Sequence, residues 1–360
     1  MSNVKYKKNF NKSSINSTST NGFLDEFKKK YTLKDIQEYI EKISDLKILV
    51  IGEAIIDEYA FGTSLGKAGK EPIIAFNVKY TEKYLGGSLA VANHLSNFCK
   101  NVDLISMLGD TKKQRSFIRN NLNNNIDPMF IYKKDSPTIV KRRYIDIESG
   151  EKIFEIYDFK DTELSPNQSQ NLSNILRDII SKYDLIIISD FGHGFITSNI
   201  RETLYRGDYL AVNTQNNAGN QGMNSIIKYI YPNYICIDEK ELRIACSDRY
   251  SDIEDLIYNG FYFQHMGTIN ITRGEYGSVI YDSTTGEFVK TPAFADKIVD
   301  KIGAGDAVLS ITSPLASMEV NPEIIGFVGN SVGALAVAYS GNKESVNKEE
   351  LYKFMEMMLK

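Results

Sequence analysis

Hydrophobic residues along this chain of 360 residues gather in short continuous runs, and helical segments such as the one starting near Ser165 lie between them. The first run, LKILVIG from residue 46, is apolar from Ile48 to Ile51, as expected of a central parallel strand covered on both faces. Similar runs occur over 101–110, 182–190, 209–215 and 234–242. This alternation predicts an α/β fold with a doubly wound, mostly parallel sheet and helices on both faces.

The N-terminal region is expected to lie outside this fold. Residues 1–22 are rich in Lys, Asn and Ser and nearly free of apolar residues, which predicts a disordered tail because little burial can offset the entropy of ordering. A basic arm for nucleic acid or membranes is the alternative, but neutral residues dilute its lysines. Over 23–44 the spacing of apolar residues predicts an added helix that packs on the main domain, 45–360.

Composition narrows the function classes. The net charge of −4 argues against a dedicated nucleic-acid binder, and no apolar run is long enough for a membrane span. Cys99, Cys236 and Cys246 lack the CxxC spacing of a zinc site and lie in apolar contexts, which indicates buried thiols. With no signal-peptide pattern at the N-terminus, we expect a cytoplasmic protein.

Two segments, 58–84 and 130–159, mix turn residues with short alternating patterns and predict a small β-element outside the main sheet. Strand alternation places Lys141 and Arg143 on one face of this element and Arg142 on the other. Two cations facing a cleft would clamp a phosphate carried by the substrate. The alternative is a solvated basic edge that prevents sheet-to-sheet association.

The stretch DKIGAGDAVLSITSPLASM, 300–318, carries the strongest candidate chemistry. Gly303, Ala304 and Gly305 fall on the first turn of a predicted helix, where free N–H groups and the helix dipole favour an anion. A carboxylate there repels phosphate, so Asp306 is better suited to take a proton from an attacking hydroxyl. The alternative is that Asp306 only caps the helix and the glycines only turn the chain.

Polar residues also follow the strand runs, where ligands of open α/β sheets collect. Glu53 and Asp57 follow the first run, but only Gly52 is present where a dinucleotide-binding fingerprint needs three glycines, which argues against an NAD-dependent oxidoreductase. Asp190 ends another run, three residues before His193. His193 could be a general base, and the alternative is a loop residue near the pocket.

DKIGAGD resembles the C-terminal signature D-T-x-G-A-G-D of the ribokinase-like (PfkB) sugar kinases, with Lys301 in place of Thr. GGSLAVANHLSNFCK, IDEKELR and TRGEYGSVIY resemble further motifs of that family, in the family's order, and extend the resemblance over 46–360. The resemblance implies a ribokinase-like domain with a β-lid that closes over the sugar and forms a homodimer contact. It also implies that Asp306 is the catalytic base and that residues 303–305 form an anion hole.

The same resemblance assigns the sugar pocket. Asp57 would hold sugar hydroxyls, and Gly86 and Gly87 would open a helix that lines the pocket. The family's Asn on that helix falls at Ala90, so Asn93, one turn away, is the candidate in its place. Asp190 belongs to a D-Y/F-G-x-G turn and is a further substrate-binding candidate.

ATP and Mg²⁺ are the implied cofactors. Asp238 and Glu241 occupy the family's N-x-x-E motif, which organises magnesium, although both are also good helix-start residues. Thr272, Gly274 and Gly277 match the T-x-G-x-x-G loop that receives the nucleotide phosphates. Near the adenine, the resemblance places Asn330 and Gly333, whose helix has small residues that equally suit close packing.

The expected reaction is ATP-dependent phosphorylation of a sugar or sugar phosphate. GEAIIDEY, PTIVKRR and SDFGHG look most like kinases that phosphorylate heptose 7-phosphate at C1 and are joined to a cytidylyltransferase-like domain. No H-x-G-H motif occurs here, so nucleotidyl transfer would require a separate partner chain. A non-catalytic sugar- or nucleotide-binding protein on the same fold is the alternative, motivated by Ala90 and Asp238.

Overall fold

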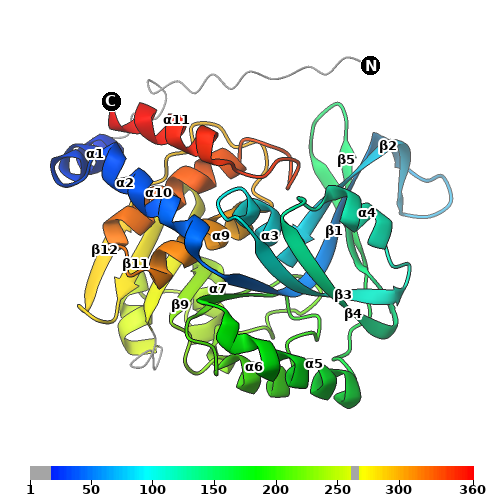
Figure 1. The fold of residues 1–360 in the computed structure, drawn as a ribbon. Coiled ribbons are helices and arrows are strands. Elements are labelled where there is room, and N and C mark those ends of the chain that lie inside the picture. Colours follow the sequence, from blue (N-terminus) through cyan, green and yellow to red (C-terminus); the bar gives the residue numbers. More distant parts are fainter. Residues whose placement is uncertain (1–17, 261–266) are drawn as a thin grey trace.

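A twisted central sheet with helices on both faces forms the body of the chain in the computed structural model, which describes residues 18–260 and 267–360 (Figure 1). The strand order is β12-β11-β10-β9-β8-β7-β1-β3-β4, and pairing is parallel from β10 through to β4. The strands are β1 (Ile48–Lys67), β3 (Val102–Thr111), β4 (Ile126–Pro137), β7 (Leu185–Asp190), β8 (Leu210–Thr214), β9 (Tyr234–Asp238), β10 (Thr268–Thr272), β11 (Ser278–Asp282) and β12 (Glu287–Thr291). The doubly wound, mostly parallel sheet predicted from the apolar runs is confirmed.

Two hydrophobic clusters, one on each face of the sheet, hold the layers together. One cluster joins the sheet to α3 (Ser88–Ser96), α9 (Ala304–Ser317), α10 (Pro322–Ala336) and α11 (Lys348–Leu359). The other joins it to α5 (Pro166–Ile179), α6 (Ser198–Leu204), α7 (Glu239–Cys246) and α8 (Ile253–Asp255). The short α4 (Arg115–Asn121) lies between β3 and β4 in the chain. Because both faces are covered, the central strands are apolar on both sides.

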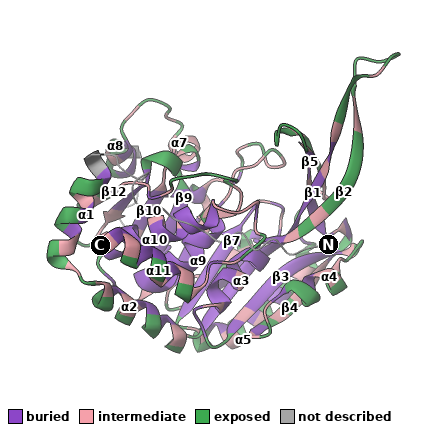
Figure 2. Cartoon of the chain, turned by 90° about the horizontal axis from the view of Figure 1, so that it is seen from above, coloured by how far each residue is buried: buried purple, intermediate pink, exposed green. Residues whose placement is uncertain are grey.

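The lid grows out of the main sheet. β1 pairs with β3 and β7 over 49–53, and from Ala54 onward it pairs with β2 (Ile74–Gly87) and β5 (Ile139–Asp146), which in turn pairs with β6 (Lys152–Asp158). These strands project from the body as an arm (Figures 1 and 2). The predicted lid segment 130–159 was too long, because residues 130–137 belong to β4 of the main sheet.

The single helix expected over 23–44 is instead two helices, α1 (Thr18–Lys30) and α2 (Leu33–Lys42). Thr32 begins α2 with a capping box, in which its side chain and that of Asp35 satisfy each other's backbone N–H groups, and this new start divides the segment. The Phe27 ring stacks 4.5 Å from that of Phe327, so α1 packs on α10. Of the predicted tail, residues 18–22 are helical, and 1–17 lie outside the described residues.

Two further features concern the helices and the cysteines of the described part of the chain. None of its helices combines the length and the apolar character that a bilayer crossing requires. All three cysteines are free thiols, and Cys99 and Cys236 are buried in the hydrophobic core.

Candidate active site

Asp306 lies in the first turn of α9, whose residues pack against α3 and the central strands. Gly303 begins the helix at φ +84°, and a Cβ there would collide with the Asn342 side chain, so both conformation and space require glycine. Gly305 has open space around it. No described side chain caps this helix start, so its N–H groups remain available to an anion.

The carboxyl group of Asp306 is set up to accept a proton near neutral pH. Burial, followed by the nearby Asp57 carboxylate, raises the pKa of Asp306 to about 7, and the Lys141 ammonium opposes this shift. A base whose pKa lies near the working pH is the most effective proton acceptor. Asp306, Asp57 and Lys141, all predicted from sequence, are therefore close enough to affect one another's charge.

One face of the lid carries the charged residues of the site. β1 and β5 run parallel in register, with Asp57 opposite Lys141 and Tyr59 opposite Arg143. Arg143 donates to Asp57 at 2.6 Å and to Glu155 at 3.0 Å, so its charge is already balanced. Of the two predicted cations, Arg143 is therefore held by carboxylates of the lid and is not available to a substrate phosphate.

Lys141 is the cation that remains available. Its ammonium lies 5.4 Å from the Tyr157 ring and 5.2 Å from the Phe191 ring, and no hydrogen bond or ion pair joins it to the described residues. Burial lowers the pKa of Lys141, which indicates a poorly solvated charge. An anionic group of a substrate would supply the missing partner.

Glycines allow β2 and α3 to approach Asp57. A Cβ on Gly86 would overlap the Asp57 carboxylate, and Gly87, at φ +61°, begins α3. Ala90 on this helix is buried. Asn93 points elsewhere, since its side chain donates to the Asn121 carbonyl at 3.0 Å and accepts from a backbone N–H at 3.1 Å on the same neighbouring segment. The structure therefore does not bring Asn93 into the pocket with Asp57.

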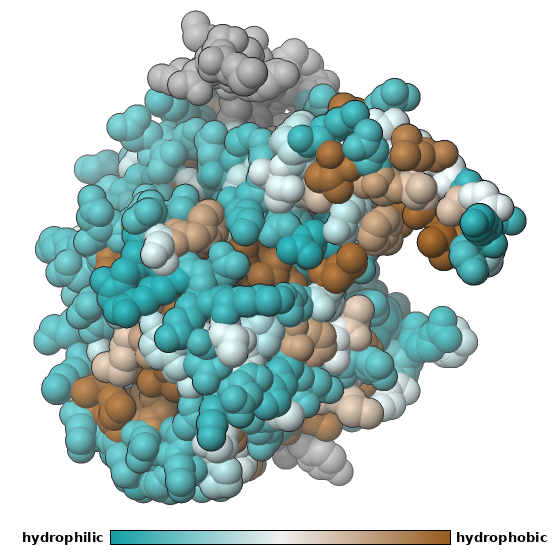
Figure 3. Space-filling model, turned by 90° about the vertical axis from the view of Figure 1, so that its right-hand side faces the viewer, coloured by the Kyte–Doolittle hydropathy of each residue, from teal (hydrophilic) through white to brown (hydrophobic). Residues whose placement is uncertain are grey.

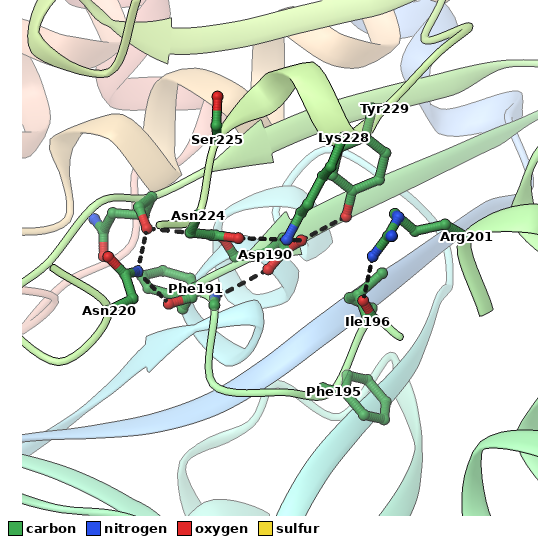
Figure 4. A network of polar contacts seen from close by, with 12 residues as sticks. Asp190, Phe191, Phe195, Ile196, Arg201, Asn220, Asn224, Ser225, Lys228 and Tyr229 are labelled. Carbon is green, nitrogen blue, oxygen red and sulfur yellow. Dashed lines mark hydrogen bonds and ion pairs between the residues drawn. The ribbon is translucent and has the colours of Figure 1, made fainter. Parts of the chain in front are cut away.

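Asp190 is held in a polar network of its own (Figure 4). Its carboxylate receives the Lys228 ammonium at 2.6 Å, the Tyr229 hydroxyl at 2.6 Å and a backbone N–H from Gly192 at 2.9 Å. It lines a cavity of about 540 Å³ together with Arg201 of α6, on the sheet face opposite α9. Asp190 therefore fixes the loop after β7, and the structure does not place it beside Asp57 and Asp306.

Glu53, to which the sequence pattern assigned no role, holds the same loop. Its fully buried carboxylate accepts the N–H groups of Phe191 at 3.0 Å, His193 at 3.0 Å and Phe195 at 3.3 Å. Burial, together with the Asp190 carboxylate, raises the pKa of Glu53 to about 7. An acidic residue directly after an apolar strand was the available signal for this anchoring role.

His193 is a packed loop residue. Its ring lies 4.9 Å from the Phe159 ring, and neither ring nitrogen has a described hydrogen-bond partner. Burial, with the nearby Lys141 ammonium, lowers the pKa of His193 to about 4, so the ring is uncharged at neutral pH. This agrees with a loop position beside the pocket.

Asp238 and Glu241 begin α7 as a capping box, in which each side chain accepts the other's backbone N–H, at 2.7 and 2.9 Å. Burial and the Asp238 carboxylate raise the pKa of Glu241 to about 8, and Asp306 contributes to this shift. Asn216, whose N–H donates to Glu241, has a buried amide without a described partner. Carboxyl oxygens and a nearby amide fit a hydrated Mg²⁺ held largely by nucleotide phosphates, although the described residues form no closed metal cluster.

The nucleotide candidates lie on the hairpin that joins β10 to β11 and on α10, which packs against α9. Thr272 ends β10, and Gly274, at φ +56°, has open space around it, as a phosphate-receiving turn requires. Gly277, at φ +82°, is closely packed against the backbone after β12. Asn330 on α10 donates to the Ser278 hydroxyl at 2.7 Å, and Gly333 faces Val308 of α9, with room for an ordinary van der Waals contact.

Solved structures of sugar kinases share this fold. Phosphofructokinase-2 from Escherichia coli in complex with potassium matches with a TM-score of 0.69 at 13% identity, covering 88% of this chain and all of that one. Ribokinase from Thermotoga maritima matches with a TM-score of 0.63 at 18% identity, covering 86% of this chain and 99% of that one.

Two curated relatives are each named Bifunctional protein HldE. The protein of Nitratiruptor sp. is 26% identical over 267 residues, 73% of this chain and 55% of its own length. That of Helicobacter pylori strain J99 is 26% identical over 302 residues, 82% of this chain and 64% of its own length. The chain thus spans between about half and two thirds of these relatives. A family model described as pfkB family carbohydrate kinase matches residues 45–349, and the chain therefore belongs to this family of carbohydrate kinases.

Proposed function

We propose that this kinase transfers the γ-phosphoryl group of ATP to a hydroxyl of a sugar that already carries a phosphate. The observation that carries the proposal is the buried Asp306, whose pKa is raised to about 7 by burial, at an uncapped helix start facing the lid's charged side chains.

In the proposed reaction, Asp57 accepts hydrogen bonds from acceptor hydroxyls and orients the reacting one toward Asp306. Asp306 takes the hydroxyl proton as the oxygen attacks phosphorus. Backbone N–H groups over 303–305 stabilise negative charge on the transferring phosphoryl group, because the helix dipole and the free donors point at the same place. The lid excludes water from this step.

ATP phosphates would approach the open turn at Gly274, and Asp238 and Glu241 would hold a magnesium ion through its water ligands. Magnesium would neutralise charge on the nucleotide phosphates. Release of the capping-box contacts is not required, since water-mediated ligation uses the free lone pairs of both carboxylates.

A phosphosugar acceptor is favoured by Lys141, the buried ammonium without a described anionic partner. Heptose 7-phosphate, phosphorylated at C1, is the acceptor suggested by the motif resemblance and by the relatives named HldE. We assign no nucleotidyl transfer to this chain, because its sequence contains no H-x-G-H motif.

The lid further supports a homodimer. Exposed hydrophobic side chains gather on the arm that projects at the upper right of Figure 3. They include Leu65, Ile73, Ile74, Val78, Tyr80, Phe154 and Ile156. A patch of this kind on a projecting sheet is typical of a protein–protein contact.

The test is magnesium-dependent ADP release from ATP across sugars and their 1-, 6- and 7-phosphates. We expect turnover on one phosphosugar, and we expect Asp306→Asn to lower kcat by on the order of a thousand-fold while ATP affinity is kept. Asp45→Asn, a surface carboxylate, is the matched control. ATP binding without turnover on any acceptor would favour the non-catalytic alternative.

A further inference from the structure

Asp300, at the start of the glycine-rich turn, joins the lid to the helix that carries Asp306. Its buried carboxylate accepts N–H groups of Ile302 at 3.2 Å and Gly341 at 3.1 Å. From the lid it accepts the Tyr59 hydroxyl at 2.9 Å and the Lys152 ammonium at 2.7 Å. One side chain therefore receives two donors from the turn region and two from the lid.

Lys152 is the described cation paired with Asp300, and it comes from a distant part of the chain. It begins β6, opposite Ile145 of β5, 148 residues before Asp300 in sequence. Burial alone would raise the pKa of Asp300, but the hydrogen bond from Lys152 holds it below the usual value. If the lid moved away, the buried carboxylate would lose its counter-charge.

The residues around Asp300 are closely packed. Loss of the Lys152 contact would therefore affect the helix start at residues 303–305. Gly341 lies against the Tyr59 ring, where a Cβ would overlap the hydroxyl, and the adjacent Asn342 lies against Gly303. Gly303 in turn begins α9, the helix of Asp306. Lid strand, carboxylate and helix start thus form one continuous contact.

We propose that Lys152 is a positioning residue that couples lid closure to the phosphoryl-binding turn. When the lid closes, its ammonium meets Asp300 and fixes the turn that presents the N–H groups of residues 303–305. Without the Lys152 contact, the N–H groups of residues 303–305 are present but less well oriented for the transition state. The loss therefore lowers turnover more than it weakens ATP binding. This inference rests on the proposed kinase function. It adds that the Lys152–Asp300 contact makes the site active only when the lid is closed.

Lys152→Ala, with Lys83→Ala as its matched control, tests the proposal. Lys83 is also a lid lysine, 36% exposed against 37% for Lys152, and it pairs at 3.3 Å with Glu58 inside the lid. We expect Lys152→Ala to lower kcat about ten-fold with the KM for ATP changed less than about three-fold, as for a misplaced anion site. Methylammonium should restore part of the loss, Lys152→Arg should retain most activity, and Lys83→Ala should match the wild type.

Hydrogen exchange of residues 300–306 without substrate gives a second measurement that does not depend on turnover. We expect faster exchange there in Lys152→Ala than in the wild type or Lys83→Ala. Equal exchange in all three proteins, or equal loss of kcat in both alanine variants, would overturn the proposal. Absence of turnover in the wild type would instead count against the proposed function, and the exchange result would still decide whether Lys152 orders the turn.

Discussion

The guanidinium of Arg143 lies 2.6 Å from the carboxylate of Asp57, and both side chains are buried in the lid. This pair keeps in place the carboxylate that we propose to bind the sugar, and it removes Arg143 from the set of cations free to bind a ligand. Lys141, two residues earlier on the same strand face, is left to meet an incoming anion.

We predict that Arg143→Met destabilises the fold by about 3–5 kcal/mol, because it leaves the Asp57 carboxylate buried without its partner. Urea unfolding followed by circular dichroism measures the change. Lys100→Met is the control, since its ion pair with Asp45 is exposed and its loss should cost less than about 1 kcal/mol. Equal effects in the two variants would show that the buried pair has no special role.

The pH dependence of turnover should report Asp306. The side chain acts as a base only when ionised, and burial raises its pKa to about 7, so kcat should rise with pH through about 7 and then level off. Lys141 lowers the pKa of Asp306, so Lys141→Met should move this rise to higher pH.

The measurement is kcat at saturating substrates from pH 5.5 to 9 for the wild type and Lys141→Met, and for Lys83→Met as a lid control. A flat profile, or a shift to lower pH in Lys141→Met, would contradict the assignment of Asp306 as the base. A separate increase in the KM of the phosphosugar in Lys141→Met would support its contact with the acceptor phosphate.

Two glycines of the anion turn should respond oppositely to alanine. Gly303→Ala should destabilise the fold by about 1–3 kcal/mol, because φ is +84° and the new methyl group meets Asn342. Gly305→Ala should leave stability within about 0.5 kcal/mol, since space there is open.

Gly305→Ala should nevertheless reduce kcat, because its methyl group would stand where the transferring phosphoryl group approaches the N–H donors. Thermal unfolding and steady-state kinetics on the same preparations separate the two effects. Full activity in a stable Gly305→Ala protein would exclude close phosphate approach at this residue.

The sequence was sufficient for the parts of the fold that depend on local pattern. Apolar runs predicted the central strands β1, β3, β7, β8 and β9. Period-two alternation correctly placed Lys141 and Arg143 on one lid face because a strand's side chains must alternate. The position of Asp306 in the first turn of a helix followed from the glycines before it.

Contacts between distant segments could not be predicted in this way. Asn93 is held by residues at and after the end of α4, and Asp190 is held by the segment that precedes β9. The sequence around Asn93 or Asp190 contains no pattern that indicates these partners. Likewise, a pattern around Lys152 cannot indicate that it meets Asp300. Which way a polar side chain points is decided by such tertiary partners.

The exposed hydrophobic residues of the lid predict a homodimer. Ile74→Lys combined with Ile156→Lys should convert the protein to a monomer, because both side chains are exposed on the arm and burying two ammonium groups in a dimer contact is costly. Light scattering after size-exclusion chromatography measures the mass. Ile227→Lys is the matched control, since Ile227 is exposed but lies outside the lid. A monomeric wild type, or a double variant that remains dimeric, would show that these side chains form no contact between copies of the chain.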